Sequence, residues 1–297
     1  MQMTLRSRAV LVLGCGLLAI STASIFIKLC AAPALTITLY RVGLASIFYF
    51  GLYRLRGCSL HKVYKRTQLI LALLSGMALS LHFITWISSL NYTSITSSVV
   101  LVVTSPIWVA LGSTIFLREK PTGLLILGIF LTATGSIIIS GADFSVDPTR
   151  LLGNVLALAG ALFVAVYLII GRRLRESMET LPYVIAVYGS AALVTMVFIL
   201  IGGTPVAGFN GATYLLLLAI SLLPQVVGHT SFNWALKYFS ATTVAIVSLG
   251  EPVGASILAW LILGEAITMM QFFGGAIILA GLILSLLVEA RRIKSGT

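Results

Sequence analysis

The chain has 297 residues, of which 59% are hydrophobic and only 9% are charged, and its formal net charge is +11 at pH 7. So little polar surface cannot cover a soluble globule of this size, which excludes soluble enzymes and soluble nucleic-acid-binding proteins. Apolar runs long enough to cross a bilayer as helices, roughly 17 to 25 residues, recur without the period-two alternation of membrane strands. We therefore expect an all-α integral membrane protein in contact with lipid.

The apolar runs predict ten membrane-spanning helices joined by short polar connections. The first run follows Arg6 and Arg8, as a secretory signal would, but it continues through "IFIKLC" and further runs follow, so we expect a retained helix. In chain order the predicted spans lie at about 8–30, 34–53, 67–90, 95–117, 122–141, 151–171, 182–202, 212–235, 241–263 and 268–289.

The distribution of positive charge predicts the orientation of these spans. If the N-terminus is cytoplasmic, the outer loops carry only Arg150, and Lys28 and Arg41 fall within spans. The other cations all lie on the inner side: Arg6, Arg8, Arg54, Arg56, Lys62, Lys65, Arg66, Arg118, Lys120, Arg172, Arg173, Arg175, Lys237, Arg291, Arg292 and Lys294. By the positive-inside rule we expect both termini in the cytoplasm and the protein in the cytoplasmic (inner) membrane.

The chain contains an internal repeat. With an offset of 146, residues 90–135 align without gaps on 236–281, and prolines, glutamates and glycines recur. The identical pairs are Leu90/Leu236, Tyr92/Tyr238, Ser94/Ser240, Thr96/Thr242, Pro106/Pro252, Leu117/Leu263, Glu119/Glu265, Thr122/Thr268, Gly128/Gly274 and Gly135/Gly281. Spans three to five therefore correspond to spans eight to ten, which divides the chain into two five-helix units, at 8–141 and 151–290.

An odd number of helices per unit predicts that the second unit enters the membrane from the opposite side. Two inverted units related by an in-plane pseudo-twofold axis, with a binding site between them near the midplane, are typical of secondary transporters that work by alternating access.

These motifs resemble a known family. Each unit has a proline in its fourth helix and a glutamate thirteen residues later, in "SPIWVALGSTIFLRE" and "EPVGASILAWLILGE", and "YRVGLA" at 40–45 is similar to the family's second helix. The chain thus resembles the EamA-type family of the drug/metabolite transporter superfamily. The resemblance implies a ten-helix fold that moves small metabolites, often amino acids or related compounds and frequently outward.

Glu251 is the most unusual residue of the apolar spans. An ionisable group deep in a bilayer normally faces a cavity or a partner, and Pro252 removes a helix hydrogen bond beside it. One interpretation is a proton-coupling or amine-binding carboxylate; the other is a structural acid bonded to backbone groups that the proline frees. The resemblance favours the structural interpretation somewhat, whereas Ser105, the repeat counterpart, is not acidic, which favours a function.

Two histidines fall at similar depths in spans three and eight. Trp86 follows His82 by one helical turn, and Asn233 follows His229 by one turn. These four residues predict a substrate site of hydrogen-bonding groups and an aromatic wall, with buried structural histidines as the alternative.

Arg41 lies about 12 Å below the outer end of its span by helical rise. We expect it to hold either a substrate carboxylate or an intramembrane partner such as Glu251. Trp108, two residues after Pro106, is a further candidate for the lining of the substrate site, although aromatic residues in membrane helices often serve packing.

Four repeat-related residues form a structural motif: Pro106, Glu119, Pro252 and Glu265. We expect the two glutamates to act in the architecture, for example by capping the next short helix. The glycines of the fifth and tenth helices leave open whether these helices lie at the periphery or form a homodimer face.

No metal site, cofactor or enzyme activity is expected. Cys58 and His61 are spaced like half a metal site, but no second pair exists. The sequence thus predicts a secondary transporter, with export of an amino acid or related compound as the first hypothesis. Uptake or exchange of a nucleoside-like or methyl-donor metabolite is the alternative within that class, and a membrane-embedded enzyme is the rival from another class.

Overall fold

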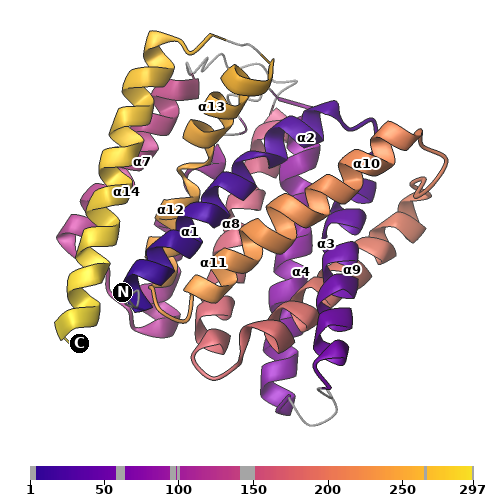
Figure 1. Ribbon diagram of the computed structural model, residues 1–297, viewed down its shortest axis with the longest axis horizontal. Helices are drawn as coiled ribbons and strands as arrows, with labels where there is room; N and C mark the ends of the chain where they lie inside the picture. Colours follow the sequence, from indigo (N-terminus) through magenta and orange to yellow (C-terminus); the bar gives the residue numbers. More distant parts are fainter. Residues whose placement is uncertain are drawn as a thin grey trace.

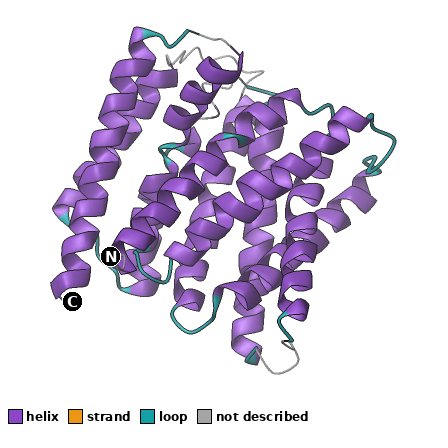
Figure 2. Ribbon diagram, viewed as in Figure 1, coloured by secondary structure: helices purple, strands orange, loops and turns teal. Residues whose placement is uncertain are grey.

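The computed structural model describes residues 5–57, 64–93, 98, 101–140, 151–263 and 266–295. All regular secondary structure in these ranges is helical (Figure 2). The predicted all-α class is therefore confirmed. Cys58, His61 and Glu265 lie outside the described residues.

Figure 1 shows the helices of the two halves of the chain packed side by side in one bundle. The first half contains α1 (Leu5–Ser21), α2 (Ala23–Leu29), α3 (Ala34–Leu55), α4 (Arg66–Ser89), α6 (Ser105–Gly112), η2 (Ser113–Leu117) and α7 (Gly123–Ser140). The second half contains α8 (Leu151–Arg175), α9 (Thr180–Gly202), α10 (Gly211–Ile220), η4 (Ser221–His229), α11 (Thr230–Ala235), α12 (Ala241–Ser248), α13 (Glu251–Leu263) and α14 (Met269–Ser295).

Eight helices of the described part are long and apolar enough to cross a membrane. The predicted fourth and fifth spans correspond to the shorter apolar helices Ser105–Leu117 and Gly123–Ile139. Large apolar side chains such as Ile47, Leu193 and Ile201 are exposed on the outside of the bundle, where lipid would cover them. The chain is a multi-pass integral membrane protein.

The predicted fourth and ninth spans are interrupted at positions that correspond in the sequence repeat. The α-helix gives way to a turn at residues 103–104, before α6, and at residues 249–250, before α13, and these positions differ by the repeat offset of 146. Pro106 and Pro252 each occupy the second position of the new helix, where the missing N–H breaks no helical hydrogen bond. The expectation that Pro252 removes a helical hydrogen bond is therefore wrong. The break therefore makes Glu251 the first residue of α13.

The eighth span contains a second irregularity. Between α10 and α11, the segment η4 widens into a π-helix that holds Pro224. Proline has no N–H to donate to the helix and its ring crowds the preceding turn, so it disfavours regular α geometry, and π-helical turns frequently occur at functional sites. This segment carries Gln225 and His229 on its buried side.

Small residues allow the helices to pack closely. α4 packs against α8 and α9, and α3 packs against α9; a Cβ at Gly76 of α4 would clash with Val187 and Ser190 of α9. α7 and α14 pack against each other through two pairs of glycines. Gly128 contacts Gly281, and Gly135 contacts Gly274. The predicted fifth and tenth spans, α7 and α14, thus pack on each other within the chain. Both termini lie at one end of the bundle, which we call the termini end (Figure 1).

Candidate functional site

The candidate site is built around Arg41 of α3, whose side chain is almost fully buried. Its Nε donates a hydrogen bond to Oε1 of Gln225 in η4, at 2.8 Å. The guanidinium carbon also lies 4.0 Å from the centre of the Phe83 ring, a cation–π contact. The carbonyl oxygen of Arg41 accepts a hydrogen bond from Ser221 Oγ at 3.1 Å. Arg41 therefore joins α3, α4 and η4.

Both histidines predicted at the site adjoin Arg41 through Phe83. The Phe83 ring meets the His229 ring edge-on with centroids 5.2 Å apart, and the His82 ring lies 5.1 Å from Phe83. Trp86 stacks against His82 with nearly parallel rings, 6.1 Å between centroids. The structure thus brings Arg41, His82, Trp86 and His229 together.

The hydrogen bond of His82 fixes its tautomer. Nδ1 lies 2.9 Å from the carbonyl oxygen of Gly160 in α8, and a carbonyl oxygen can only accept, so Nδ1 carries the hydrogen. In a neutral ring Nε2 then presents a lone pair. His82 is able to accept a hydrogen bond there.

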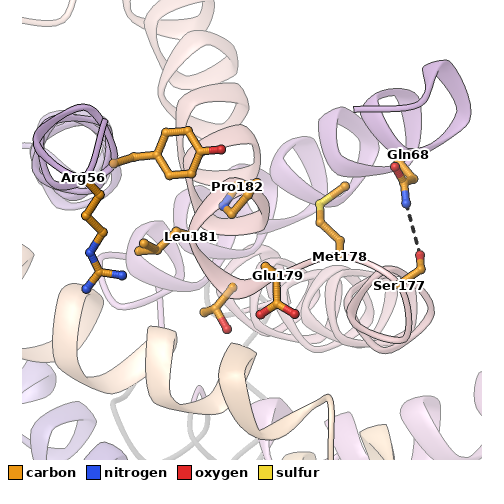
Figure 3. A pocket seen from close by; sticks show the side chains of 9 residues that line it. Arg56, Gln68, Ser177, Met178, Glu179, Leu181 and Pro182 are labelled. Atoms are coloured by element: carbon orange, nitrogen blue, oxygen red, sulfur yellow. Dashed lines mark hydrogen bonds between the residues drawn. The ribbon is translucent and has the colours of Figure 1, made fainter. Parts of the chain in front are cut away.

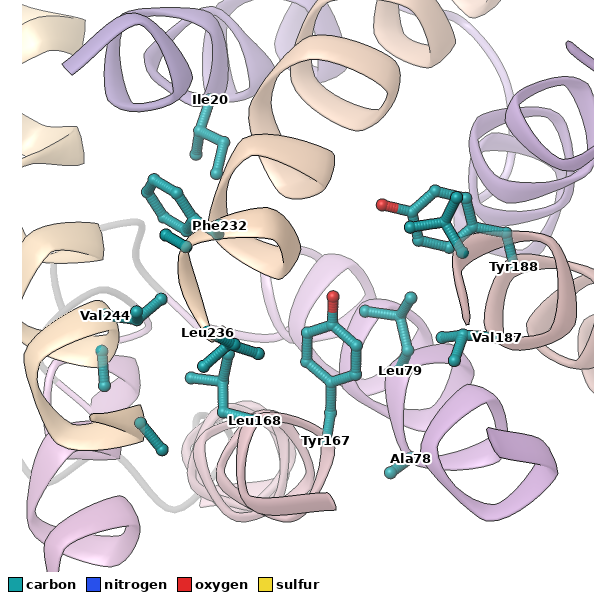
Figure 4. Close-up of a cluster of buried hydrophobic side chains, with 14 of the residues drawn as sticks. Ile20, Ala78, Leu79, Tyr167, Leu168, Val187, Tyr188, Phe232, Leu236 and Val244 are labelled. Atoms are coloured by element: carbon teal, nitrogen blue, oxygen red, sulfur yellow. The ribbon is translucent and has the colours of Figure 1, made fainter. Parts of the chain in front are cut away.

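Asn233 already has partners at both ends of its amide. The Tyr167 hydroxyl donates to Oδ1 at 2.5 Å, and Nδ2 donates to the Tyr188 hydroxyl at 3.0 Å. Tyr188 in turn lies 3.0 Å from Thr230 Oγ1, which donates to the carbonyl oxygen of Gln225 at 3.3 Å. Figure 4 shows the two tyrosine hydroxyls pointing from separate helices toward one region of the core. Asn233 therefore orients the tyrosines.

We use the name central polar cluster for these buried residues from both halves of the chain: Arg41, His82, Tyr167, Tyr188, Gln225, His229 and Asn233. Sequence reasoning missed Tyr167, Tyr188 and Gln225. Pro224 was the available signal for Gln225, because an internal proline marks an irregular helix whose next residue leaves the regular helical face.

Glu251 stands beside the central polar cluster at the start of α13. Its carboxyl group interacts electrostatically with Arg41, although the ion pairs found within the described residues do not include these two side chains. The described hydrogen bonds do not show its carboxyl group bonded to the backbone near Pro252 either, as the structural interpretation expected. The residue is half-buried.

Trp108 takes up a different position from the other predicted residues. Its Nε1 donates to Thr104 Oγ1 at 3.1 Å, and the ring packs on the hydrophobic core. The contacts described for this ring do not reach the central polar cluster.

Glu119 does not cap the following helix, contrary to our expectation. Its Oε1 accepts a hydrogen bond from Arg172 Nε of α8 at 2.8 Å, and Arg172 Nη1 donates to the Leu236 carbonyl at 2.8 Å. The capping position is filled by Thr122, whose hydroxyl accepts from the Leu125 amide. The carboxylate pairs with Arg172 because the guanidinium carries a full positive charge, whereas the N-terminus of a helix carries the equivalent of about half a charge.

Arg175 is a second arginine of α8 with a structural position that the sequence did not reveal. It is almost fully buried and donates to the Asn233 carbonyl oxygen at 3.0 Å, to Thr180 Oγ1 at 2.7 Å and to the Met178 carbonyl oxygen. Arg172 and Arg175 therefore satisfy carbonyl groups at the end of α11 that have no helical partner.

The described cavity lies away from the central polar cluster, at the termini end (Figure 3). It is a partly open crevice of about 570 Å³ between α3, α4 and the turn from α8 to α9. Two of its polar side chains already have partners: Gln68 donates to Ser177 at 3.1 Å, and Glu179 accepts from Lys237 at 3.0 Å. We therefore place the candidate site at the central polar cluster, where buried donors remain unpaired.

Comparison with known proteins identifies the family. The model of the EamA-like transporter family matches residues 7–141 and 151–287. The chain belongs to this family. The resemblance seen in the sequence is confirmed.

Relatives of this EamA-family protein are named as transporters. An uncharacterized transporter of Clostridium kluyveri is 27% identical over 72% of this chain and 71% of its own. An uncharacterized transporter of Archaeoglobus fulgidus is 23% identical over 89% of this chain and 91% of its own. The UDP-galactose/UDP-glucose transporter 7 of Arabidopsis thaliana is 28% identical over 54% of this chain and 51% of its own.

A solved crystal structure shares the fold, with a TM-score of 0.81 over 96% of this chain and 99% of the other at 20% identity. Together with the family, the named relatives support a membrane transporter of small metabolites.

Proposed function

We propose that this EamA-family protein exports an amino acid or a related small metabolite across the cytoplasmic membrane, with the central polar cluster as its binding site. The observation that carries the proposal is a set of buried polar side chains gathered from both halves of the chain. Arg41 and His82 come from the first half, and Gln225, His229 and Asn233 come from the second. Polar groups inside membrane proteins are costly and normally line a substrate path.

Two inverted five-helix units, 8–141 and 151–290, are the proposed framework for alternating access. Their symmetry is supported by contacts that map onto themselves under the repeat offset. Gly128 contacts Gly281. The repeat counterpart of Gly128 is Gly274 and that of Gly281 is Gly135, and these two glycines are also in contact. The family model, which matches once in each half, supports the same division.

A second pair of contacts supports the inverted arrangement. Gly16 of α1 approaches Ser231 and Phe232, and Gly160 of α8 approaches Thr85 and Trp86. Thr85 and Trp86 are the repeat counterparts of Ser231 and Phe232. The first helix of each half thus packs on the third helix of the other.

The termini end is proposed to face the cytoplasm. The ends of α3 and α8 and the start of α4 carry the basic residues there, including Arg54, Arg66 and Arg173. Positive charge is retained on the cytoplasmic side of membrane proteins. In this orientation export would begin with entry from the termini end.

Glu251 is the proposed coupling residue. It begins an interrupted helix and interacts electrostatically with Arg41, and the hydrogen bonds of the described residues do not include one to its carboxyl group. A carboxyl group in such a place is able to exchange a proton as access alternates. Trp108 is kept as a candidate for the lining of the transport path outside the central polar cluster.

The transport of a nucleoside-like metabolite is the second candidate function. It is favoured by the Arabidopsis relative, whose name states transport of UDP-galactose and UDP-glucose. Nucleosides and amino acids are therefore both included in the experiment.

The test is a thermal-shift screen of metabolites on the purified protein, followed by efflux from proteoliposomes for every compound that stabilises it. We expect at least one stabilising compound to be transported, and Arg41→Ala to abolish both effects. Leu193→Ala on the lipid-facing surface is the control. The proposal is wrong if none of the stabilising compounds is transported.

A further inference from the structure

Two hydrogen-bond donors of the central polar cluster are buried without a partner in the described structure. They are Nη1 of Arg41 and Nε2 of Gln225. Arg41 is 1% exposed and Gln225 is 0% exposed. Leaving a buried donor unsatisfied carries a free-energy penalty, more so for a charged group, and such groups call for an explanation.

The orientation of the Gln225 amide follows from its bond to Arg41. Arg41 Nε can only donate, so the atom 2.8 Å away must be the amide oxygen. The amide nitrogen is then the free end. Both unpaired donors therefore belong to one hydrogen-bonded pair, and both require an acceptor.

Charge indicates what kind of acceptor fits. The guanidinium has a full positive charge in a buried position, and the described ion pairs do not give it a carboxylate within 4 Å. Uncompensated charge in a membrane interior is strongly unfavourable, whereas a guanidinium binds a planar carboxylate through several N–H groups. Among the described residues, Glu251 is the one acidic side chain that interacts electrostatically with Arg41. A single guanidinium therefore matches at most one anionic group on the substrate.

Two other polar groups of the cluster, Asn233 and His82, do not compete for this role. The Asn233 amide is bonded at both ends, and the His82 Nδ1 is bonded to Gly160. His82 Nε2 is an acceptor in the neutral ring, so it is suited to a donor of the substrate.

We infer that Arg41 and Gln225 form a subsite for the carboxylate group of a zwitterionic or monoanionic substrate. Arg41 Nη1 and Gln225 Nε2 donate to the carboxylate oxygens. Phe83 covers the guanidinium, which holds the charged plane in place. This inference rests on the proposed function, in which the central polar cluster is the transport site.

The test compares acids with their amides in proteoliposomes loaded for counterflow. The probes are the proteinogenic L-amino acids, their α-carboxamides, and the neutral nucleosides adenosine and uridine. Amino acid and amide both keep the amine and side chain, so their ratio isolates the carboxylate. We expect the counterflow rate of a transported acid to exceed that of its amide by about tenfold or more, which corresponds to the free energy of a hydrogen bond to a charged group.

The variant Gln225→Leu tests the subsite itself. It removes one donor, so the acid-to-amide ratio should fall by about tenfold. Gln68→Leu, a matched change in the crevice at the termini end, should leave the ratio unchanged. Arg41→Lys keeps the charge but loses the planar guanidinium, and it should reduce the ratio as well. Thermal melting of each purified variant establishes that it is folded.

The outcomes separate the two proposals. Equal handling of acids and amides, or an unchanged ratio in folded Gln225→Leu, overturns the carboxylate subsite. Transport of nucleosides without any amino acid also overturns it while the transporter function stands. If no compound is transported, the proposed function fails and the subsite fails with it.

Discussion

The side chains of Arg41 and Gln225 meet at 2.8 Å although the two residues lie 184 positions apart in the chain. One comes from the straight helix α3 and the other from the π-helical segment η4. Their hydrogen bond links the halves of the molecule at the place where unpaired donors gather. Both the stability of the bundle and the chemistry of the candidate site therefore depend on this pair.

Replacing Gln225 with leucine should destabilise the protein. The change removes the acceptor of Arg41 Nε, so a charged donor loses its partner in a buried site. We expect a loss of about 1 to 3 kcal/mol in the free energy of unfolding. Thermal melting in detergent measures it, and Gln68→Leu, at the edge of the surface crevice, should change stability by less. Equal melting temperatures for wild type and Gln225→Leu would contradict the prediction.

The network around Asn233 should behave as a unit. Tyr167→Phe and Asn233→Leu each remove the same buried hydrogen bond, so the double variant should lose less stability than the sum of the two single variants. We expect a coupling free energy of about 0.5 to 3 kcal/mol in a double-mutant cycle. Additive losses would mean that the two groups act independently.

Much of the fold was predictable because lipid imposes simple rules. Continuous apolar runs predicted the long helices, whereas residues 241–263 were predicted to form one unbroken span, and the break that makes Glu251 the first residue of α13 was not predicted. His82 and Trp86 were predicted to be neighbours because residues one turn apart share a helix face. Each of these predictions needed only local sequence.

The rest depended on contacts between distant segments. Gln225 looks like an ordinary polar residue until the turn of η4 brings it to Arg41. Arg175 looks like one more cation of the positive-inside pattern, yet it is buried against α11, while Arg173 is exposed. A charge count treats these two arginines alike. Only the packing of α8 on its neighbours separates them.

Arg172 should matter more for stability than its partner Glu119. Arg172 donates to the Glu119 carboxylate and to the carbonyl oxygens of Leu236 and Lys237, so Arg172→Ala breaks three hydrogen bonds and Glu119→Ala breaks one. We expect faster amide hydrogen exchange at residues 236–240 in Arg172→Ala than in Glu119→Ala. Arg173→Ala, which removes an exposed pair, is the control. Similar exchange in Arg172→Ala and Arg173→Ala would refute this role.

The pair between Glu179 and Lys237 should give a small dependence of stability on pH. The hydrogen bond from Lys237 holds the pKa of Glu179 below its ordinary value. A lowered pKa in the folded state stabilises the protein above the unfolded pKa of about 4.3, and this contribution is lost as the pH falls through the folded value. Because Glu179 is largely exposed, we expect about 0 to 1 kcal/mol. The stability curves of wild type and Lys237→Met should therefore converge in acid; a constant gap would exclude this origin.

Glu251→Gln separates a coupling role from a structural one. The amide has nearly the same shape but cannot release a proton, so it should slow proton-coupled flux in proteoliposomes and remove its pH dependence. Folding should be retained, because the described hydrogen bonds do not include one to this carboxyl group. Ser105→Ala, at the repeat position in α6, is the matched control, and its flux should keep the pH dependence of the wild type. If Glu251→Gln transports at the normal rate with the normal pH dependence, the carboxyl group is not the coupling group. If the variant is transport-competent but melts at a much lower temperature, Glu251 serves the architecture of the interrupted helix.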